Sequence, residues 1–255
     1  MPSNYSHSKL STFEECKHKY KLKYIEFKKV DSKTPAFFVV GSVVHKALEL
    51  LYKEVAKERI VSKEELNQLF EKEWGIAFKR PVLFQDKSES ELKLLAWKYL
   101  EDFYKRYAPF DELGVLGVET KDKLKLRNGS LYDVRIDKLA FKDGVYFVCD
   151  YKTSSSSFSV EEASSDRQLG MYAFWVRSRF RSAKRVVLLW HMLARNEEVR
   201  VEQGEEELKR IEEGVIRLIE EIEQTKEFPK KPSERCAYCE YKIICEENKS
   251  INEFL

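Results

Sequence analysis

The stretch that decides the fold is Leu131-Tyr132-Asp133-Val134-Arg135-Ile136-Asp137-Lys138-Leu139-Ala140-Phe141-Lys142-Asp143-Gly144-Val145-Tyr146-Phe147-Val148-Cys149-Asp150-Tyr151-Lys152. Its two arms are rich in β-branched and aromatic residues, which predicts two strands. The Asp-Gly dipeptide between them is the strongest short-range signal for a two-residue hairpin turn. We therefore expect an antiparallel hairpin at the centre of a sheet.

The register of this hairpin brings two acids together. With a two-residue turn, Asp137 lies directly opposite Asp150, and Lys152 shares a face with Asp150. Facing like charges with Cβ atoms about 5 Å apart repel one another. A divalent cation held between the carboxylates would turn that repulsion into affinity. The alternative is a pair of solvated acids that Arg135 and Lys152 neutralise as surface ion pairs.

Composition limits the remaining possibilities. The 255 residues are enough for one large domain, and 43% hydrophobic residues suit a globular core. The net charge of +2 means that a nucleic-acid surface must be a local patch. No apolar run is long enough for a membrane span, and the first residues lack an apolar signal core, which favours the cytoplasm.

Helical and strand patterns alternate along the rest of the chain. Ser62 and Ser88 each begin a capping-box pattern, as does Ser159. We expect helices at about 10–27, 39–57, 62–80, 88–108, 160–180 and 205–224, and further strands at 115–126, 185–193 and 198–201. This order indicates an α/β or α+β domain.

The five cysteines are better candidates for ligands or core residues than for disulfides in such a chain. Cys236 and Cys239 form a C-x2-C pair, and Cys245 follows closely. Thiolates are ligands of zinc and of iron–sulfur clusters, and spacing alone does not choose between them. Cys16 is the better fourth ligand, because Cys149 alternates away from the hairpin acids and is expected in the core. The alternative is a set of buried thiols without metal.

Six motifs follow one another along the chain. They are the opening cysteine motif Tyr5–Cys16, the G-x3-H stretch Gly41–His45, the acid-bearing strand Val134–Asp137, the D-x-K signature Asp150–Thr153, the Q-x3-Y stretch Gln168–Tyr172 and the three tail cysteines. In this order they resemble the RecB-like branch of the PD-(D/E)XK nuclease superfamily that carries an iron–sulfur cluster, including CRISPR-associated adaptation nucleases and AddB-type nuclease domains. Lys138 departs from the commoner pattern, in which an Arg follows the first acid.

The resemblance implies a restriction-endonuclease-like mixed sheet flanked by helices, with an iron–sulfur clasp joining the two termini. Residues 1–30 would carry the first cluster cysteine, 31–225 would form the nuclease core, and 226–255 would complete the cluster. The helices at about 60–108 would be an insertion, which the motifs do not explain.

The resemblance also implies hydrolysis of phosphodiester bonds in DNA, with single-stranded ends as the substrate and DNA repair or CRISPR adaptation as the setting. Asp137, Asp150 and His45 would bind Mg²⁺ or Mn²⁺, since carboxylate oxygens are hard ligands and imidazole favours Mn²⁺. Lys152 would act with the two acids in catalysis. Glu119 is a candidate for a further acid near the metal.

Other residues take roles from the same resemblance. Gln168 and Tyr172 project from one helical face and would steady the substrate. A [4Fe–4S] cluster would be bound by four cysteines, which are Cys16, Cys236, Cys239 and Cys245. The basic groups are phosphate-binding candidates or ordinary solvated surface: Lys17, Lys19, Lys21, Lys23, Arg177, Arg179, Arg181, Lys184 and Arg185. The competing hypotheses are a DNA-binding or assembly subunit with a vestigial nuclease site and a zinc-stabilised form of the nuclease.

Overall fold

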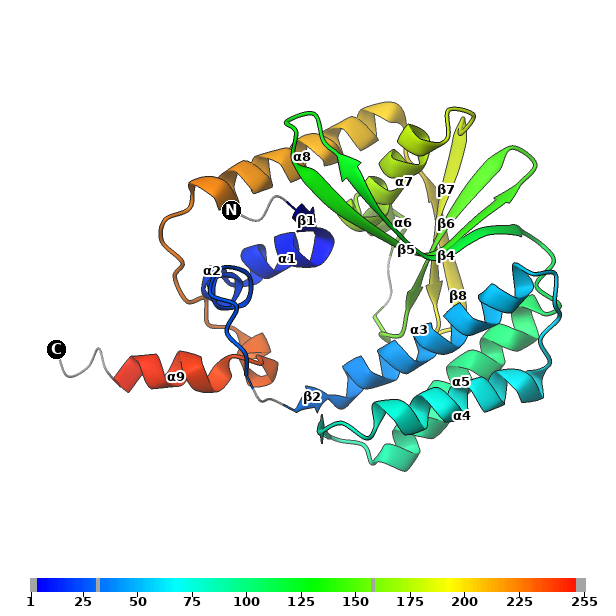
Figure 1. The fold of residues 1–255 in the computed structure, drawn as a ribbon, viewed down its shortest axis with the longest axis horizontal. Helices are drawn as coiled ribbons and strands as arrows, with labels where there is room; N and C mark the ends of the chain where they lie inside the picture. Colours follow the sequence, from blue (N-terminus) through cyan, green and yellow to red (C-terminus); the bar gives the residue numbers. More distant parts are fainter. Residues whose placement is uncertain (1–3, 31–32, 157–158, 251–255) are drawn as a thin grey trace.

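A mixed sheet of six strands forms the centre of the protein (Figure 1). The computed structural model describes residues 4–30, 33–156 and 159–250. The strands are β1 (Asn4–Ser6), β4 (Gly114–Lys125), β5 (Leu131–Lys142), β6 (Val145–Lys152), β7 (Arg185–Met192) and β8 (Glu197–Glu202). Their order is β1-β5-β6-β7-β8, with β4 paired to β5, and β6 runs parallel to β7. The predicted α/β fold with a mixed sheet is confirmed.

The hairpin of β5 and β6 has the predicted turn and register. Both residues of the Asp-Gly turn have left-handed backbones, with φ of +50° and +81°. The antiparallel pairs continue from the turn to Lys138 opposite Cys149. Pairing ends there, one step before the expected pair of Asp137 with Asp150, so the two acids lie just beyond the ladder rather than within it.

Helices cover both faces of the sheet. α3 (Ala36–Val55), α4 (Lys63–Ala77) and α5 (Glu89–Tyr107) share one apolar core with residues of β4 and β6 (Figure 1). α7 (Arg167–Arg179) contributes to a second core on the other face, together with α8 (Glu205–Gln224) and α1 (His7–Glu15). The shorter elements are α2 (Lys17–Tyr20), β2 (Thr34–Pro35), β3 (Val82–Leu83), α6 (Val160–Ser164) and α9 (Lys242–Ser250). Within the described residues, none of the helices is long and apolar enough to cross a membrane.

Local capping chemistry fixes where the helices begin. The capping boxes predicted at Ser62, Ser88 and Ser159 are all present. The single helix predicted over 160–180 is instead two helices. Asp166 has an extended backbone, and its side chain accepts a hydrogen bond from the backbone N–H of Leu169, which starts α7 afresh. The prediction of one continuous helix was therefore wrong at this point.

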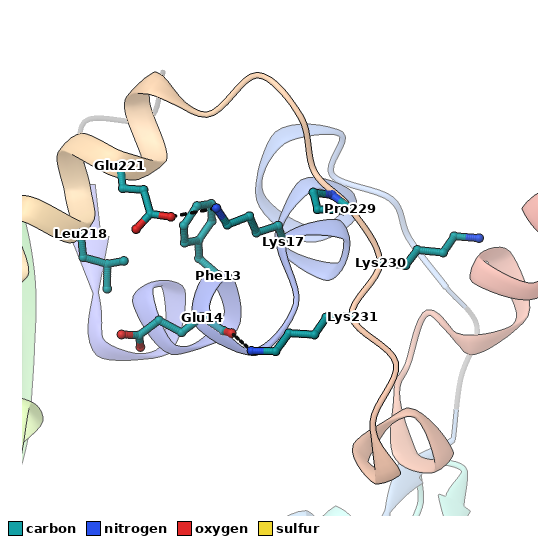
Figure 2. Close-up of a pocket in the computed structure, with 8 residues that line it drawn as sticks. All are labelled: Phe13, Glu14, Lys17, Leu218, Glu221, Pro229, Lys230 and Lys231. Carbon is teal, nitrogen blue, oxygen red and sulfur yellow. Dashed lines mark hydrogen bonds and ion pairs between the residues drawn. The ribbon is translucent and has the colours of Figure 1, made fainter.

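The first and last described segments of the chain meet. The predicted helix over 10–27 is interrupted at Cys16, whose backbone is extended. On one side of the junction Lys17 pairs with Glu221 of α8 at 2.8 Å, and the ammonium of Lys231 donates to the carbonyl of Glu14 at 3.0 Å (Figure 2). These contacts hold the segment after α8 against α1 and α2. The outermost residues, 1–3 and 251–255, lie outside the described part.

Gly170 lets α7 approach α8. A Cβ at this position would lie 2.5 Å from Cδ1 of Ile211 and 3.1 Å from Oε1 of Gln203. We expect Gly170→Ala to lower the free energy of unfolding by about 1–3 kcal/mol, because the site has no room for a methyl group. Urea denaturation followed by circular dichroism measures the change.

The matched control is Gly214→Ala on α8, where the added methyl has nothing within 4 Å. It should leave the free energy of unfolding unchanged or raise it by up to about 1 kcal/mol, since alanine favours helix over glycine. Equal stability of the two variants would contradict the close approach of α7 and α8.

Candidate active site

The candidate site lies at a gap along one edge of β5. β4 pairs along the opposite edge, while β1 pairs with residues 131–133 and β6 with residues 138–142. No described strand pairs with residues 134–137 on this edge. Just beyond the last pair, the backbone N–H of Tyr151 donates to Oδ2 of Asp137 at 2.9 Å. The Asp137 carboxylate thus accepts the hydrogen bond that a backbone carbonyl of β5 would accept in a continued ladder. This hydrogen bond fixes the carboxylate at the point where β5 and β6 separate.

α3 brings His45 to this carboxylate. Nδ1 of His45 lies 3.4 Å from Oδ2 of Asp137, and its ring meets the ring of Tyr151 edge-on at 5.9 Å. Burial disfavours the protonated imidazole, but the hydrogen bond to Asp137 and the charges of Asp137 and Asp150 outweigh burial and raise the pKa of His45. The predicted meeting of the helix-borne histidine with the first acid is present in the structure.

Gly41, the glycine of the G-x3-H stretch, lies where α3 comes close to the end of β6. A Cβ on Gly41 would lie 3.2 Å from Oγ1 of Thr153, which follows directly after β6. Glycine therefore allows α3 to pack closely against the end of β6. His45 is four residues later on the same helical face, so the close approach at Gly41 sets the position of the imidazole.

Glu119 completes a group of three ligands. It lies on β4 between Val118, which pairs with Lys138, and Thr120, which pairs with Ile136. Its φ of +48° is uncommon for a residue other than glycine. One ligand atom from each of His45, Glu119 and Asp137 lies within 4.8 Å of the others. Arg135 pairs with the Glu119 carboxylate at 2.6 Å. The sequence allows Arg135 to neutralise the hairpin acids; in the structure, its ion-pair partner is Glu119.

The buried Asp150 and the half-buried Lys152 form an ion pair beside this group. Their charged atoms are 2.7 Å apart, and Asp150 is only 4% exposed. Burial raises the pKa of Asp150 to about 6, with the Lys152 ammonium opposing the rise and the charge of Asp137 adding to it. Burial disfavours the Lys152 ammonium, but Asp150 outweighs this effect and raises the pKa of Lys152. Asp150 is not one of the three residues whose ligand atoms lie within 4.8 Å.

Gln168 and Tyr172 extend the ion pair into α7. The ammonium of Lys152 donates to Oε1 of Gln168 at 3.3 Å, and the Gln168 amide donates to the Tyr172 hydroxyl at 3.1 Å. Burial raises the pKa of Tyr172, so the hydroxyl stays protonated near neutral pH. The predicted Q-x3-Y face thus contacts the predicted catalytic lysine.

The cysteines are placed in two regions. Cys16 lies between α1 and α2, while Cys236, Cys239 and Cys245 lie in the last segment. Burial raises the pKa of Cys239, and the nearby charge of Cys16 adds to the rise. No three of the described cysteines have sulfur atoms within 4.8 Å of one another. Cys149 is 1% exposed in the core, as the strand alternation predicted.

The first predicted basic patch is occupied by acidic partners, and the second is occupied in part. Each lysine of the first group makes an ion pair: Lys17 with Glu221, Lys19 and Lys23 with Glu240, and Lys21 with Glu26. In the second group, Arg185 pairs with Glu202 and Arg177 donates to the carbonyl of Gln203. For the first group, these contacts favour the interpretation of ordinary charged surface over a phosphate-binding patch.

Comparison with known proteins identifies the family. Residues 4–246 match the PD-(D/E)XK nuclease superfamily. The chain belongs to this superfamily. No curated protein matches the chain. A solved structure of a provisionally assigned exonuclease from Eubacterium rectale has 13% sequence identity and a TM-score of 0.53, covering 90% of this chain and 85% of the other.

A second solved structure, of a protein called SSO0001, has 14% identity and a TM-score of 0.37, covering 90% of this chain and 94% of the other. At 13% identity, the likeness to the Eubacterium rectale protein concerns the fold. The superfamily match assigns the protein to a family of nucleases, which implies a nucleic-acid substrate.

The contact between Gly41 and Thr153 can be tested through metal affinity. We expect Gly41→Ala to weaken Mn²⁺ binding by about tenfold, because the methyl group displaces α3 and with it the His45 imidazole. Titration calorimetry with Mn²⁺ measures the change. The double variant Gly41→Ala/Thr153→Ala should recover most of the affinity, because it removes the hydroxyl that the methyl meets.

Gly75→Ala on α4 is the control, since nothing lies within 4 Å of its added methyl. It should bind Mn²⁺ like the unchanged protein. Equal Mn²⁺ affinity in all these variants would show that Gly41 does not set the position of His45.

Proposed function

We propose that the protein is a Mg²⁺- or Mn²⁺-dependent deoxyribonuclease, acting as an exonuclease on single-stranded DNA ends. The observation that carries the proposal is the convergence of His45, Glu119 and Asp137 beside the Asp150–Lys152 pair. Together these residues supply hard oxygen ligands, an imidazole and a fixed ammonium at one point of the sheet. The choice of DNA and of single-stranded ends rests on the order of the six sequence motifs.

The donor set suits a hard divalent cation. Asp137, Glu119 and His45 would bind it, with Asp150 the adjacent acid. The fit rests on carboxylate oxygens that converge across neighbouring strands despite their mutual repulsion. When bound, such an ion acidifies a water molecule and neutralises charge on a phosphate.

The protein's own residues would prepare the rest of the reaction site. Lys152 keeps a proton on Nζ through its pairing with Asp150, so its charge is available to a phosphate oxygen. Gln168 restrains the ammonium from the side of α7, and Tyr172 in turn orients the Gln168 amide. This hydrogen-bonded chain would hold Lys152 in one place as negative charge develops on the substrate.

We further propose that the chain belongs to the iron–sulfur, RecB-like branch. Cys16, Cys236, Cys239 and Cys245 would bind a [4Fe–4S] cluster that joins residues 1–30 and 226–255 around the core at 31–225. Four thiols on segments that already contact each other are the supporting observation. The setting would be DNA repair or CRISPR adaptation.

The nuclease proposal is tested by Lys152→Ala. We expect it to slow digestion of end-labelled single-stranded DNA in Mn²⁺ by at least about a hundredfold, because it removes the charge that would stabilise the developing phosphate charge. The fold and the Mn²⁺ affinity should persist. Labelling the 5′ or the 3′ end in separate reactions shows the direction of digestion.

Lys142→Ala is the matched control, an exposed lysine at the other end of the same hairpin. Undiminished digestion by Lys152→Ala would end the proposed role of Lys152. Wild-type protein that binds strands in Mn²⁺ without cutting them would support the vestigial, DNA-binding alternative instead.

The cluster is tested by anaerobic purification with a visible spectrum and metal analysis. We expect a brown protein with about four irons per chain. Cys16→Ser and Cys245→Ser should each lose iron, whereas Cys149→Ala should keep it, since that thiol lies in the core. A colourless protein with stoichiometric zinc would identify the zinc-stabilised alternative.

A further inference from the structure

Three aromatic side chains lie together on the surface, away from both cores. Phe37 and Phe38, at the start of α3, are 46% and 60% exposed, and their ring centroids are 4.3 Å apart. Tyr238, from the cysteine-bearing segment, is 51% exposed and meets Phe37 edge-on at 6.4 Å. We call these three residues the aromatic platform. Single exposed apolar side chains are ordinary, but clustered exposed aromatic rings indicate a binding surface.

The platform has a defined relation to the candidate active site. Phe38 precedes His45 by seven residues on α3. Seven residues are close to two helical turns, so both side chains leave the helix in nearly the same direction, about 10 Å apart along its axis. Ser42, four residues after Phe38 and three before His45, is exposed, so the face of α3 between them is open to solvent. A ligand that follows this face of α3 from His45 reaches Phe38 next.

Positive charge precedes the platform along the chain. Lys28, Lys29 and Lys33 are exposed and precede α3 in the sequence. The backbone carbonyl of Lys28 accepts a hydrogen bond from the Tyr241 hydroxyl at 3.2 Å, which ties this lysine-bearing stretch to the segment that supplies Tyr238. Aromatic faces for bases and lysines for phosphates are the combination that binds single-stranded nucleic acid.

We propose that the aromatic platform stacks the bases of a single-stranded nucleic acid whose backbone continues along α3 to His45 and Asp137. The proposal rests on the nuclease function and assigns its substrate class through contacts outside the reacting atoms. Stacking is available only to unpaired bases, so the platform would favour single strands over duplexes. It would do so without strong sequence preference, because every base has a π-face.

Binding is measured in the Lys152→Ala background, so that the strand stays whole, by fluorescence anisotropy with a labelled single-stranded oligonucleotide. We expect Phe38→Ala to raise Kd by about tenfold, within the range known for one base–aromatic stack. Phe38→Trp should keep the affinity. Phe38→Leu should lose as much as Phe38→Ala, because leucine is apolar but has no flat ring.

Abasic sugars placed one at a time along the strand locate the stacked base. One position should weaken binding when Phe38 is present and have no effect in Phe38→Ala. Leu94→Ala is the matched control, an apolar side chain that is 71% exposed on α5, and it should leave Kd unchanged.

Unchanged Kd in Phe38→Ala would overturn the platform, and so would full affinity in Phe38→Leu, which would show that the position needs no flat ring. The two proposals fail separately. If the wild-type protein cuts DNA but binding does not depend on Phe38, only the platform is wrong. If binding depends on Phe38 but the wild-type protein cuts nothing, only the hydrolytic function is wrong.

Discussion

The site depends on one hydrogen bond, from the backbone N–H of Tyr151 to the carboxylate of Asp137. Where a strand ladder ends, the next N–H still needs an acceptor, because an unpaired buried donor is costly. Asp137 supplies that acceptor from its side chain. The hydrogen bond therefore completes the edge of β6 and immobilises a metal-ligand candidate. The orientation of the carboxylate is part of the sheet and does not depend on a flexible loop.

The charges around this carboxylate are unevenly compensated. Arg135 lies 2.6 Å from Glu119, and Lys152 lies 2.7 Å from Asp150. Among the described residues, the ion-pair partner of Asp137 within 4 Å is His45, at 3.4 Å. A cation placed among the acids gains at Asp137, because in the described part of the chain no arginine or lysine forms an ion pair with this carboxylate within 4 Å. This distribution is what marks Asp137 as the centre of the proposed metal site.

The sequence predicted the backbone around this site well where local rules govern it. The Asp-Gly turn fixed the register that places Asp137 near Asp150, and the capping serines fixed three helix starts. It failed where tertiary contacts govern. The early end of the β5–β6 ladder, the left-handed backbone at Glu119 and the restart of the helix at Asp166 depend on neighbours distant in sequence or on competing caps. Periodicity does not report such contacts.

α3 carries residues of both the candidate active site and the aromatic platform, and its helical period places them on one face. Phe38, Gly41 and His45 are three and four residues apart, so they share one face of a single continuous helix. Gly41 fixes how closely that face approaches β6, and this distance sets where His45 meets Asp137. Phe38 and His45 therefore keep a spacing of about two helical turns, which connects one ring of the proposed platform to one ligand of the proposed metal site.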